Sequence, residues 1–318
     1  MEGLAEMKIG GVDEQHGRQP SPRPGEGQAK LGAPRSLPSR SVTIAGKPAT
    51  MYCRPMIESG VLGKKVLFLY PPPVLTEVVE ELARREFEVY LIGNHDKARR
   101  YLASEPESIV FVNIDEGLAE PEWEAWVRGL RDDEKTAGVG IGIMSLNDDQ
   151  ELKTKYLMDL QVQCGYVTLK IGSAKTAEIL AKTLEANEAR GKRRFVRART
   201  SPGTTLCAAN FEGSTLRGEI RDFSIAGMAV QFEGGAALKA GTVLRAIALT
   251  IKGGRVSIDG VVVAHRNVDA TASAQETDRA STILMFDPSS LDDVKREKLR
   301  SLILKVNQAE FDRTLEGM

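Results

Sequence analysis

Short apolar runs alternate with segments of helical periodicity between residue 64 and about residue 187. The runs lie at residues 65–70, 88–93, 108–114, 139–146 and 165–171. They are apolar almost throughout, which is typical of parallel strands that are buried on both faces of a sheet. Most segments between them carry apolar residues at three- and four-residue spacing. The pattern predicts five βα units in a doubly wound parallel sheet of flavodoxin-like size.

The pattern changes after about residue 190. Strand-like runs broken by Gly, Asn and Asp lie at residues 204–213, 216–224, 227–235, 242–254, 255–268 and 280–286. Turn signals at this spacing predict an antiparallel barrel or sandwich. A terminal helix is expected to follow Ser289 or Ser290 as N-cap, with Asp292 and Asp293 in its first turn. It should cover one end or face of the barrel with a stripe made of Leu291, Val294, Leu299, Leu302, Ile303 and Val306.

Composition divides the 318 residues into a tail and two domains. Residues 1–40 are rich in Gly, Pro, Arg, Ser and Gln and have no apolar periodicity, so we expect a disordered tail. We expect an α/β domain at residues 41–187, which begins with a weakly alternating stretch at 41–63 that forms a hairpin. We expect the second domain at residues 188–318.

Charge and cysteine content exclude several classes of protein. The formal net charge of -1 gives no overall attraction to nucleic acid or to an anionic membrane, so an anion site requires local clustering. Cys53, Cys164 and Cys207 lie far apart and have no close Cys or His neighbours, so we expect no metal and no cofactor. A signal peptide and a membrane span are both absent from the pattern, and we expect a cytoplasmic protein.

Positive charge is concentrated in the sequence RGKRRFVRAR at residues 190–199. Arginines four residues apart, such as Arg193 and Arg197, can hold phosphate oxygens in a bidentate manner and stack on a purine. The segment therefore predicts an anion site. Its basic residues are Arg190, Lys192, Arg193, Arg194, Arg197 and Arg199.

Acceptor groups follow in the sequence RDFSIAG, at a turn between two predicted strands. Asp222 and Ser224 are two residues apart, so in an extended strand they point to the same face and can accept from guanine N1–H and N2–H groups. Gly227 permits a close backbone approach or a positive φ angle. The two segments together offer cations, acceptors and space for a ligand.

These two segments resemble the fingerprint of the PilZ family, RxxxR followed by DxSxxG. They read Arg193-Arg-Phe-Val-Arg197 and Asp222-Phe-Ser224-Ile-Ala-Gly227. The resemblance covers about residues 190–306 and implies a six-stranded PilZ β-barrel with a C-terminal helix that binds cyclic di-GMP. It implies that the arginines hold phosphate and the Hoogsteen edge of guanine, and that Asp222 and Ser224 hold another base edge. Lys192 and Arg194 are expected to add phosphate contacts.

The five βα units resemble a response-regulator receiver domain that has lost its chemistry. A receiver ends its first strand with acidic magnesium ligands, whereas Tyr-Pro-Pro stands here at 70–72. Asn113 occupies the phosphoacceptor position, and without metal ligands the nearby Asp115 lacks the charge neutralisation that phosphoryl transfer needs. Ser145 and Lys170 stand where a receiver has a hydroxyl and a lysine. We interpret this part as a pseudo-receiver that supplies a protein contact surface.

The pattern favours a second-messenger receptor over an enzyme, because no nucleophile or carboxylate is arranged around His16, His95 or His265 as a catalytic set. Trp123 and Trp126 are interpreted as core anchors.

We expect cyclic di-GMP to order the segment between the domains and to change the angle between them. An unidentified protein partner in motility, adhesion or matrix control would read that change, and a homodimer stays open. The alternatives are a protein-interaction scaffold without nucleotide binding and a DNA-binding regulator.

Overall fold

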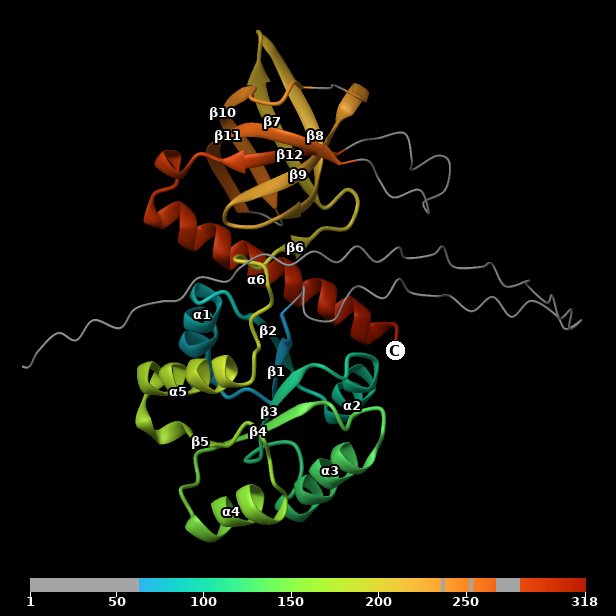
Figure 1. Cartoon of the computed structure of the whole chain (residues 1–318), viewed down its shortest axis with the longest axis vertical. Helices are drawn as coiled ribbons and strands as arrows, with labels where there is room; N and C mark the ends of the chain where they lie inside the picture. Colours follow the sequence, from blue (N-terminus) through green and yellow to red (C-terminus); the bar gives the residue numbers. More distant parts are fainter. Residues whose placement is uncertain (1–62, 236–237, 252–253, 267–280) are drawn as a thin grey trace, which may run out of the picture. The chain divides into compact units, whose positions relative to one another are not determined.

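The computed structural model describes residues 63–235, 238–251, 254–266 and 281–318, which form an α/β domain, a β-barrel and a long C-terminal helix (Figure 1). The predicted tail at 1–40 lies outside these residues, as do Cys53 and all of the predicted hairpin except Gly63. All the described residues belong to one compact unit of the chain.

The α/β domain is built on five parallel strands in the order β2-β1-β3-β4-β5. This is the strand order of the flavodoxin-like fold, so the predicted fold class is confirmed. The order places the carboxyl ends of β1, β3 and β4 side by side at one edge of the sheet. The strands are β1 (Lys65–Leu69), β2 (Glu88–Ile92), β3 (Ile109–Asn113), β4 (Gly140–Ser145) and β5 (Tyr166–Thr168).

Helices cover both faces of this sheet, as the almost continuous apolar strands require. Val66 and Phe68 of β1 contact the core beneath α1 and α5, whereas Leu67 and Leu69 contact the core beneath α2 and α3. The helices are α1 (Thr76–Arg84), α2 (His95–Ser104), α3 (Glu120–Asp132), α4 (Gln150–Thr154) and α5 (Ser173–Ala186). Short helical turns lie at Pro73–Leu75, Lys155–Asp159 and Leu169–Ile171.

The second domain is a closed antiparallel barrel of six strands. Its ring runs β8-β7-β10-β11-β12-β9, and pairing of β9 with β8 closes it. This confirms the predicted barrel. A short seventh strand, β6 (Ala198–Arg199), pairs with β8 outside the ring. The six are β7 (Thr205–Phe211), β8 (Ser214–Phe223), β9 (Gly227–Phe232), β10 (Val243–Ile251), β11 (Gly254–Arg266) and β12 (Ser281–Phe286).

Helix α6 (Asp293–Glu316) begins later than the sequence predicts. The carboxylate of Asp292 accepts a hydrogen bond from the Lys295 N–H at 2.8 Å and caps the helix. The two serines predicted as caps lie in a 3₁₀ turn at Pro288–Ser290, where the Asp287 carboxylate accepts from the backbone at 2.9 Å. Asp292 is therefore the N-cap and not part of the first turn.

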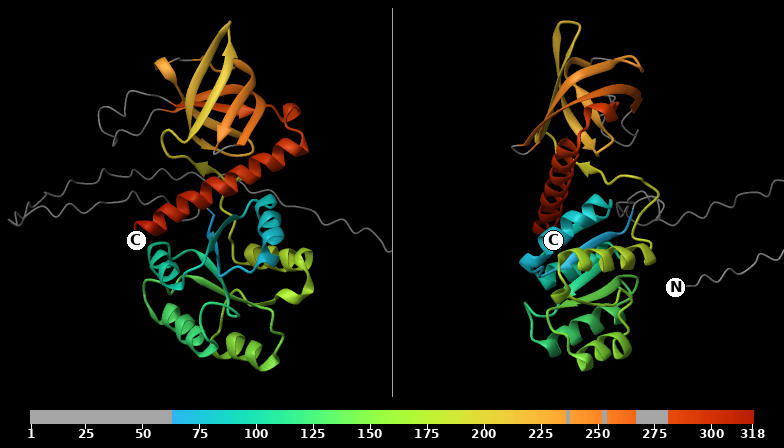
Figure 2. Two further views of the ribbon diagram at one scale, coloured as in Figure 1. Left: turned by 180° about the vertical axis from the view of Figure 1, so that it is seen from behind. Right: turned by 90° about the vertical axis from the view of Figure 1, so that its left-hand side faces the viewer.

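Helix α6 packs on the barrel and on the α/β domain (Figures 1 and 2). Leu299, Leu302, Ile303 and Val306 join the barrel core, as predicted, whereas Val294 is 77% exposed and does not belong to that stripe. Near the other end of the helix, the Phe311 ring stacks on Tyr90 with ring centroids 4.7 Å apart. The side-chain amide of Gln308 exchanges two hydrogen bonds of 2.9 Å with the backbone of Leu91. It thereby pairs part of the free edge of β2.

The two described cysteines, Cys164 and Cys207, are buried and unpaired. Burial raises the pKa of their thiols to about 11 and about 12, so both are unreactive at neutral pH. In the described part of the chain, no helix is both long enough and apolar enough to cross a membrane.

Candidate ligand-binding site

The arginine-rich segment leads directly into β6, which fixes the direction of its side chains. Ala198 is fully buried in the barrel core. Since side chains alternate in an extended segment, its neighbours Arg197 and Arg199 both point away from that core. The pairing of β6 with β8 then sets Arg199 directly opposite Asp222. Strand pairing thus brings the two motifs together on the outside of the barrel.

A β-bulge places Asp222 on the outer face. In the pairing of β8 with β9, Arg221 is an extra residue between Ile220 and Asp222. Ile220 and Phe223 are both buried in the core, so the bulge allows two consecutive residues, Arg221 and Asp222, to face outward. A regular strand would have turned one of these two side chains inward.

The Asp222 carboxylate contacts two arginines from different parts of the chain. Arg197 Nη1 lies 3.6 Å from Oδ1, and Arg266 Nη1 at the end of β11 lies 3.2 Å from Oδ2. The aspartate side chain is only 17% exposed, whereas the arginines are 42% and 54% exposed. The carboxylate is therefore held at the base of the site and the cations remain open to solvent.

Arg193 belongs to the same cluster. Burial lowers the pKa of its guanidinium, the neighbouring Arg197 and Arg199 lower it further, and Asp222 opposes the shift. The cluster thus contains four guanidinium groups and one carboxylate. Such an excess of positive charge attracts an anion that carries more than one negative group.

The serine and the glycine of the second motif form a tight turn between β8 and β9. The Ser224 hydroxyl accepts from the Ala226 N–H at 3.2 Å and donates to the Gly227 carbonyl at 3.4 Å. The Ser224 N–H also donates to that carbonyl, at 2.8 Å. The turn begins two residues after Asp222 and keeps the Ser224 side chain buried. The hydroxyl thus stabilises the turn.

The structure brings Arg197 into contact with Asp222, places Arg193 where the charges of Arg197 and Asp222 affect its pKa, and sets Ser224 and Gly227 in the adjoining turn. The other two predicted site residues, Lys192 and Arg194, are exposed, and the Arg194 guanidinium lies 5.1 Å from the centroid of the Phe195 ring.

Sequence reasoning missed Arg266 and did not include Arg199 among the binding residues. Arg199 was visible as part of the basic run, and its alternation with Ala198 was a usable signal. Arg266 had no comparable signal, because only the order of strands in the barrel brings β11 near Asp222.

The edge of the α/β sheet at which a receiver binds magnesium is occupied by internal contacts. The Asn113 amide donates to the Tyr70 carbonyl at 2.8 Å. The Asp115 carboxylate accepts from the Ser145 hydroxyl at 2.6 Å and from the Leu146 N–H at 2.5 Å. Across the ranges that the structure describes, no three His, Cys, Asp or Glu side chains are grouped so as to hold a metal ion.

The tryptophans and the two described histidines make structural contacts. Trp123 is fully buried and donates from its indole N–H to the Glu116 carbonyl at 3.0 Å. His95 lies 3.1 Å from the Tyr70 hydroxyl, and His265 lies 2.7 Å from the Leu238 carbonyl oxygen. These contacts agree with the interpretation of Trp123 and Trp126 as core anchors, since Trp126 is also buried.

The family model of the PilZ domain matches residues 191–305. The match begins in the arginine segment, includes Asp222 and the Ser224–Gly227 turn, and ends within α6. Residues 191–305 form a PilZ domain. The PilZ domain therefore contains every site residue predicted from the sequence, together with Arg199 and Arg266.

Three solved structures are similar to parts of this chain. The PilZ domain of YcgR from Escherichia coli with c-di-GMP has 18% identity and a TM-score of 0.35, over 39% of this chain and 97% of that chain. The K. pneumonia MrkH–c-di-GMP complex has 20% identity and a TM-score of 0.33, over 40% and 57% of the two chains. A response regulator from Desulfuromonas acetoxidans has 12% identity and a TM-score of 0.33, over 39% and 98%. No curated protein matches the chain.

Proposed function

We propose that the chain is a cytoplasmic receptor for cyclic di-GMP and not an enzyme. The observation that carries this proposal is the contact of Arg197 and Arg266 with Asp222 inside a PilZ domain. It joins the cation of the first motif and the acceptor of the second motif in one open site. A cyclic dinucleotide needs both, because its two phosphates are anionic and its guanine edges donate hydrogen bonds.

The contacts of Asp222 indicate how the proposed ligand would bind. Arg197 and Arg266 are more than two-fifths exposed, so each can turn from the carboxylate to a phosphate oxygen. Asp222 is then free to accept from the guanine N1–H and N2–H groups, and Arg193 adds a further cation. Ser224 would hold the base edge beside Asp222, and Gly227 would contribute by letting β9 pass close to β12 at the end of the turn. Lys192 and Arg194 would add outer phosphate contacts.

In this proposal, ligand binding changes the conformation of the receptor, and a protein partner recognises that change. The arginine segment lies between the α/β domain and the barrel, so a ligand that holds it changes the contacts of both. The α/β domain would act as a pseudo-receiver that presents a contact surface, because its sheet edge is occupied by hydrogen bonds among Tyr70, Asn113, Asp115 and Ser145. Motility, adhesion or matrix production would be the controlled output.

Titration calorimetry of the full chain with cyclic di-GMP, beside GTP and cyclic AMP, tests the receptor proposal. We expect saturable heat with cyclic di-GMP alone. Arg197→Ala should weaken binding about 10- to 100-fold, since it removes one charge-assisted contact. Asp222→Ala should also weaken it.

A matched control is Arg245→Ala, because Arg245 also pairs with an aspartate on the barrel surface, at 3.4 Å from Asp259 on β11. This variant should bind like the wild-type chain. Absence of heat with the wild-type chain would contradict the receptor proposal and favour a protein-interaction scaffold. A mobility shift with duplex DNA that weakens steeply with salt would favour the DNA-binding alternative.

A further inference from the structure

A carboxylate of the α/β domain contacts the middle of the arginine segment. Glu86 Oε2 accepts a hydrogen bond from the Val196 N–H at 2.9 Å. Val196 lies immediately before Arg197 and three residues after Arg193, so this bond holds the backbone between the two arginines. On the other side, the Asn307 side chain of α6 donates to the Arg197 carbonyl at 3.4 Å.

A glutamate at position 86 is energetically unfavourable, both because its carboxylate is largely buried and because of its backbone conformation. Its side chain is only 17% exposed, and burial raises its pKa, although the Val196 N–H, Arg300 and Arg190 oppose the shift. Its φ angle of 62° lies in the left-handed region, which favours glycine or asparagine after a helix. A buried carboxylate in an unfavourable backbone conformation indicates a specific role for the side chain.

The position of Glu86 connects it to both motifs of the ligand site. One small cavity is lined by Glu86, by Val196 of the arginine segment and by Ile225 of the turn that follows Asp222. Arg300 of α6 lines it too, with its Nε 3.9 Å from Glu86 Oε1. Glu86 therefore contacts the arginine segment directly through the Val196 N–H, and it shares this cavity with Ile225 of the acceptor turn.

We propose that Glu86 is a positioning residue of the cyclic di-GMP site, which holds the Val196 N–H so that the adjacent Arg197 stays directed at Asp222 and the segment that carries Arg193 stays fixed. This inference rests on the function proposed above. The α/β domain then contributes to ligand affinity through a segment that it fixes before the ligand arrives. By linkage, ligand binding strengthens the contact of the α/β domain with the segment by the same factor.

Calorimetry of the full chain with cyclic di-GMP tests the proposal with two variants. Glu86→Ala removes the acceptor and should weaken binding about ten-fold, the effect of one hydrogen bond. Glu86→Gln keeps a carbonyl acceptor for the Val196 N–H and should bind within about three-fold of wild type. Arg300 also donates to Glu297 at 2.8 Å, so neither variant should leave its guanidinium without a partner.

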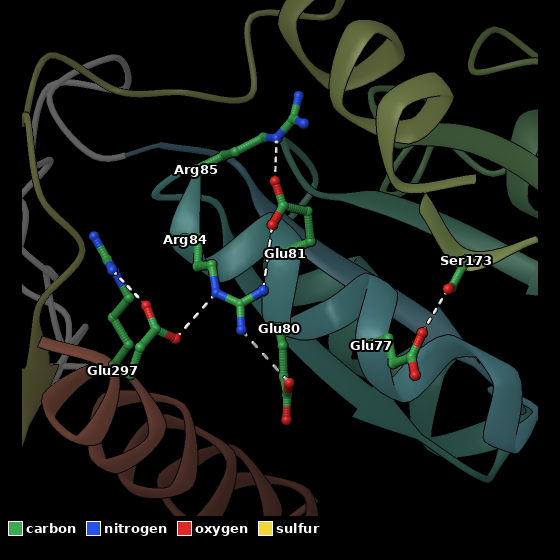
Figure 3. Close-up of polar contacts among 8 residues, drawn as sticks. Glu77, Glu80, Glu81, Arg84, Arg85, Ser173 and Glu297 are labelled. Carbon is green, nitrogen blue, oxygen red and sulfur yellow. Dashed lines mark hydrogen bonds and ion pairs between the residues drawn. The ribbon is translucent and has the colours of Figure 1, made fainter. Parts of the chain in front are cut away.

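The matched control is Glu77→Ala, which removes a hydrogen-bonded carboxylate in α1, the helix that precedes Glu86. Glu77 accepts from the Ser173 hydroxyl of α5 at 2.5 Å, so its contact stays within the α/β domain (Figure 3). This variant should bind like the wild-type chain. Hydrogen exchange of the ligand-free chain adds a second readout, since the amides of residues 193–197 should exchange faster in Glu86→Ala than in Glu86→Gln.

The possible results separate this inference from the proposed function. A wild-type chain that gives no heat overturns both. If Glu86→Ala binds as tightly as wild type, or if Glu86→Gln loses as much affinity as Glu86→Ala, only the positioning role is overturned.

If Glu86→Ala does not fold, Glu86→Asp replaces it, because its shorter side chain keeps the charge but does not reach Val196. Glu86→Asp should then bind about ten-fold more weakly than Glu86→Gln, and equal affinities would refute the role.

Discussion

Gly227 lies where β9 passes close to β12, and a side chain at this position would collide with the neighbouring backbone. A Cβ atom on Gly227 would lie 2.3 Å from the Leu284 carbonyl oxygen and 3.2 Å from the Met285 Cα. Gly227 is not among the residues with a positive φ angle. Of the two reasons that the sequence offered for this glycine, close backbone approach is therefore the correct one.

We predict that Gly227→Ala destabilises the folded chain. The added methyl group has to push β12 away from β9, and overpacking of this kind costs about 1–3 kcal/mol. Urea unfolding followed by circular dichroism measures the change in the free energy of unfolding. Gly93→Ala is the control, because nothing lies within 4 Å of a Cβ at that position. Equal unfolding midpoints for the two variants would contradict the prediction.

How far the site could be predicted depends on the distance between its residues along the chain. RxxxR and DxSxxG are local patterns that can be recognised along the chain, and the structure brings Arg197 of the first within 3.6 Å of Asp222 of the second. Arg266 and Glu86 were not predictable, because their contacts depend on the order of strands in the barrel and on the packing of the α/β domain. The Asp222 bulge was equally hidden, since an extra residue in a strand carries no composition signal.

Helix α6 shows the same limit at the scale of an element. Its periodicity predicted an apolar stripe that covers the barrel, which the structure confirms, but it did not predict that the same helix also enters the core of the α/β domain. The helix joins the barrel core through Leu302 and Ile303 and the core of the α/β domain through Phe311 and Leu315. The five βα units were easier to predict, because each parallel strand is a separate apolar run with its own crossover helix.

Apolar contacts, and not surface ion pairs, should fix α6 to the α/β domain. Phe311 is buried against Tyr90 and Tyr101, with ring centroids 4.7 and 4.8 Å away. The ion pair between Arg84 of α1 and Glu297 of α6 has a distance of 3.0 Å, but both side chains are more than two-fifths exposed (Figure 3). Water and salt screen such a pair, so it contributes at most about 1 kcal/mol.

We therefore predict that Phe311→Ala lowers the free energy of unfolding by about 3–5 kcal/mol, and that Arg84→Ala lowers it by less than about 1 kcal/mol. Urea unfolding of the two variants beside the wild-type chain provides the measurement. Raising the salt concentration should change the midpoint of the wild-type chain more than that of Arg84→Ala. A larger loss in Arg84→Ala than in Phe311→Ala would show that charge holds the helix in place.

The whole molecule should unfold as one unit, because α6 is part of both cores. The chain contains two tryptophans, and both lie in α3 of the α/β domain. Their fluorescence therefore reports unfolding of that domain, although the proposed ligand site lies on the barrel. If the two domains are coupled through α6 and through the Glu86 contact, a ligand that binds the barrel also stabilises the environment of Trp123 and Trp126.

We predict that cyclic di-GMP at about 100 times its dissociation constant raises the free energy of unfolding by about 2.7 kcal/mol when unfolding is followed by tryptophan fluorescence. The same shift should appear in scanning calorimetry as a single transition at a higher temperature, because one cooperative unit has one midpoint. Arg197→Ala, which should bind weakly, should show little of the shift and serves as the control. Calorimetry could instead show two transitions, with the ligand shifting only one of them and the fluorescence midpoint unchanged. The barrel and the α/β domain would then unfold separately. The segment held by Glu86 would then not transmit binding energy, and the output of the receptor would have to come from the barrel surface itself.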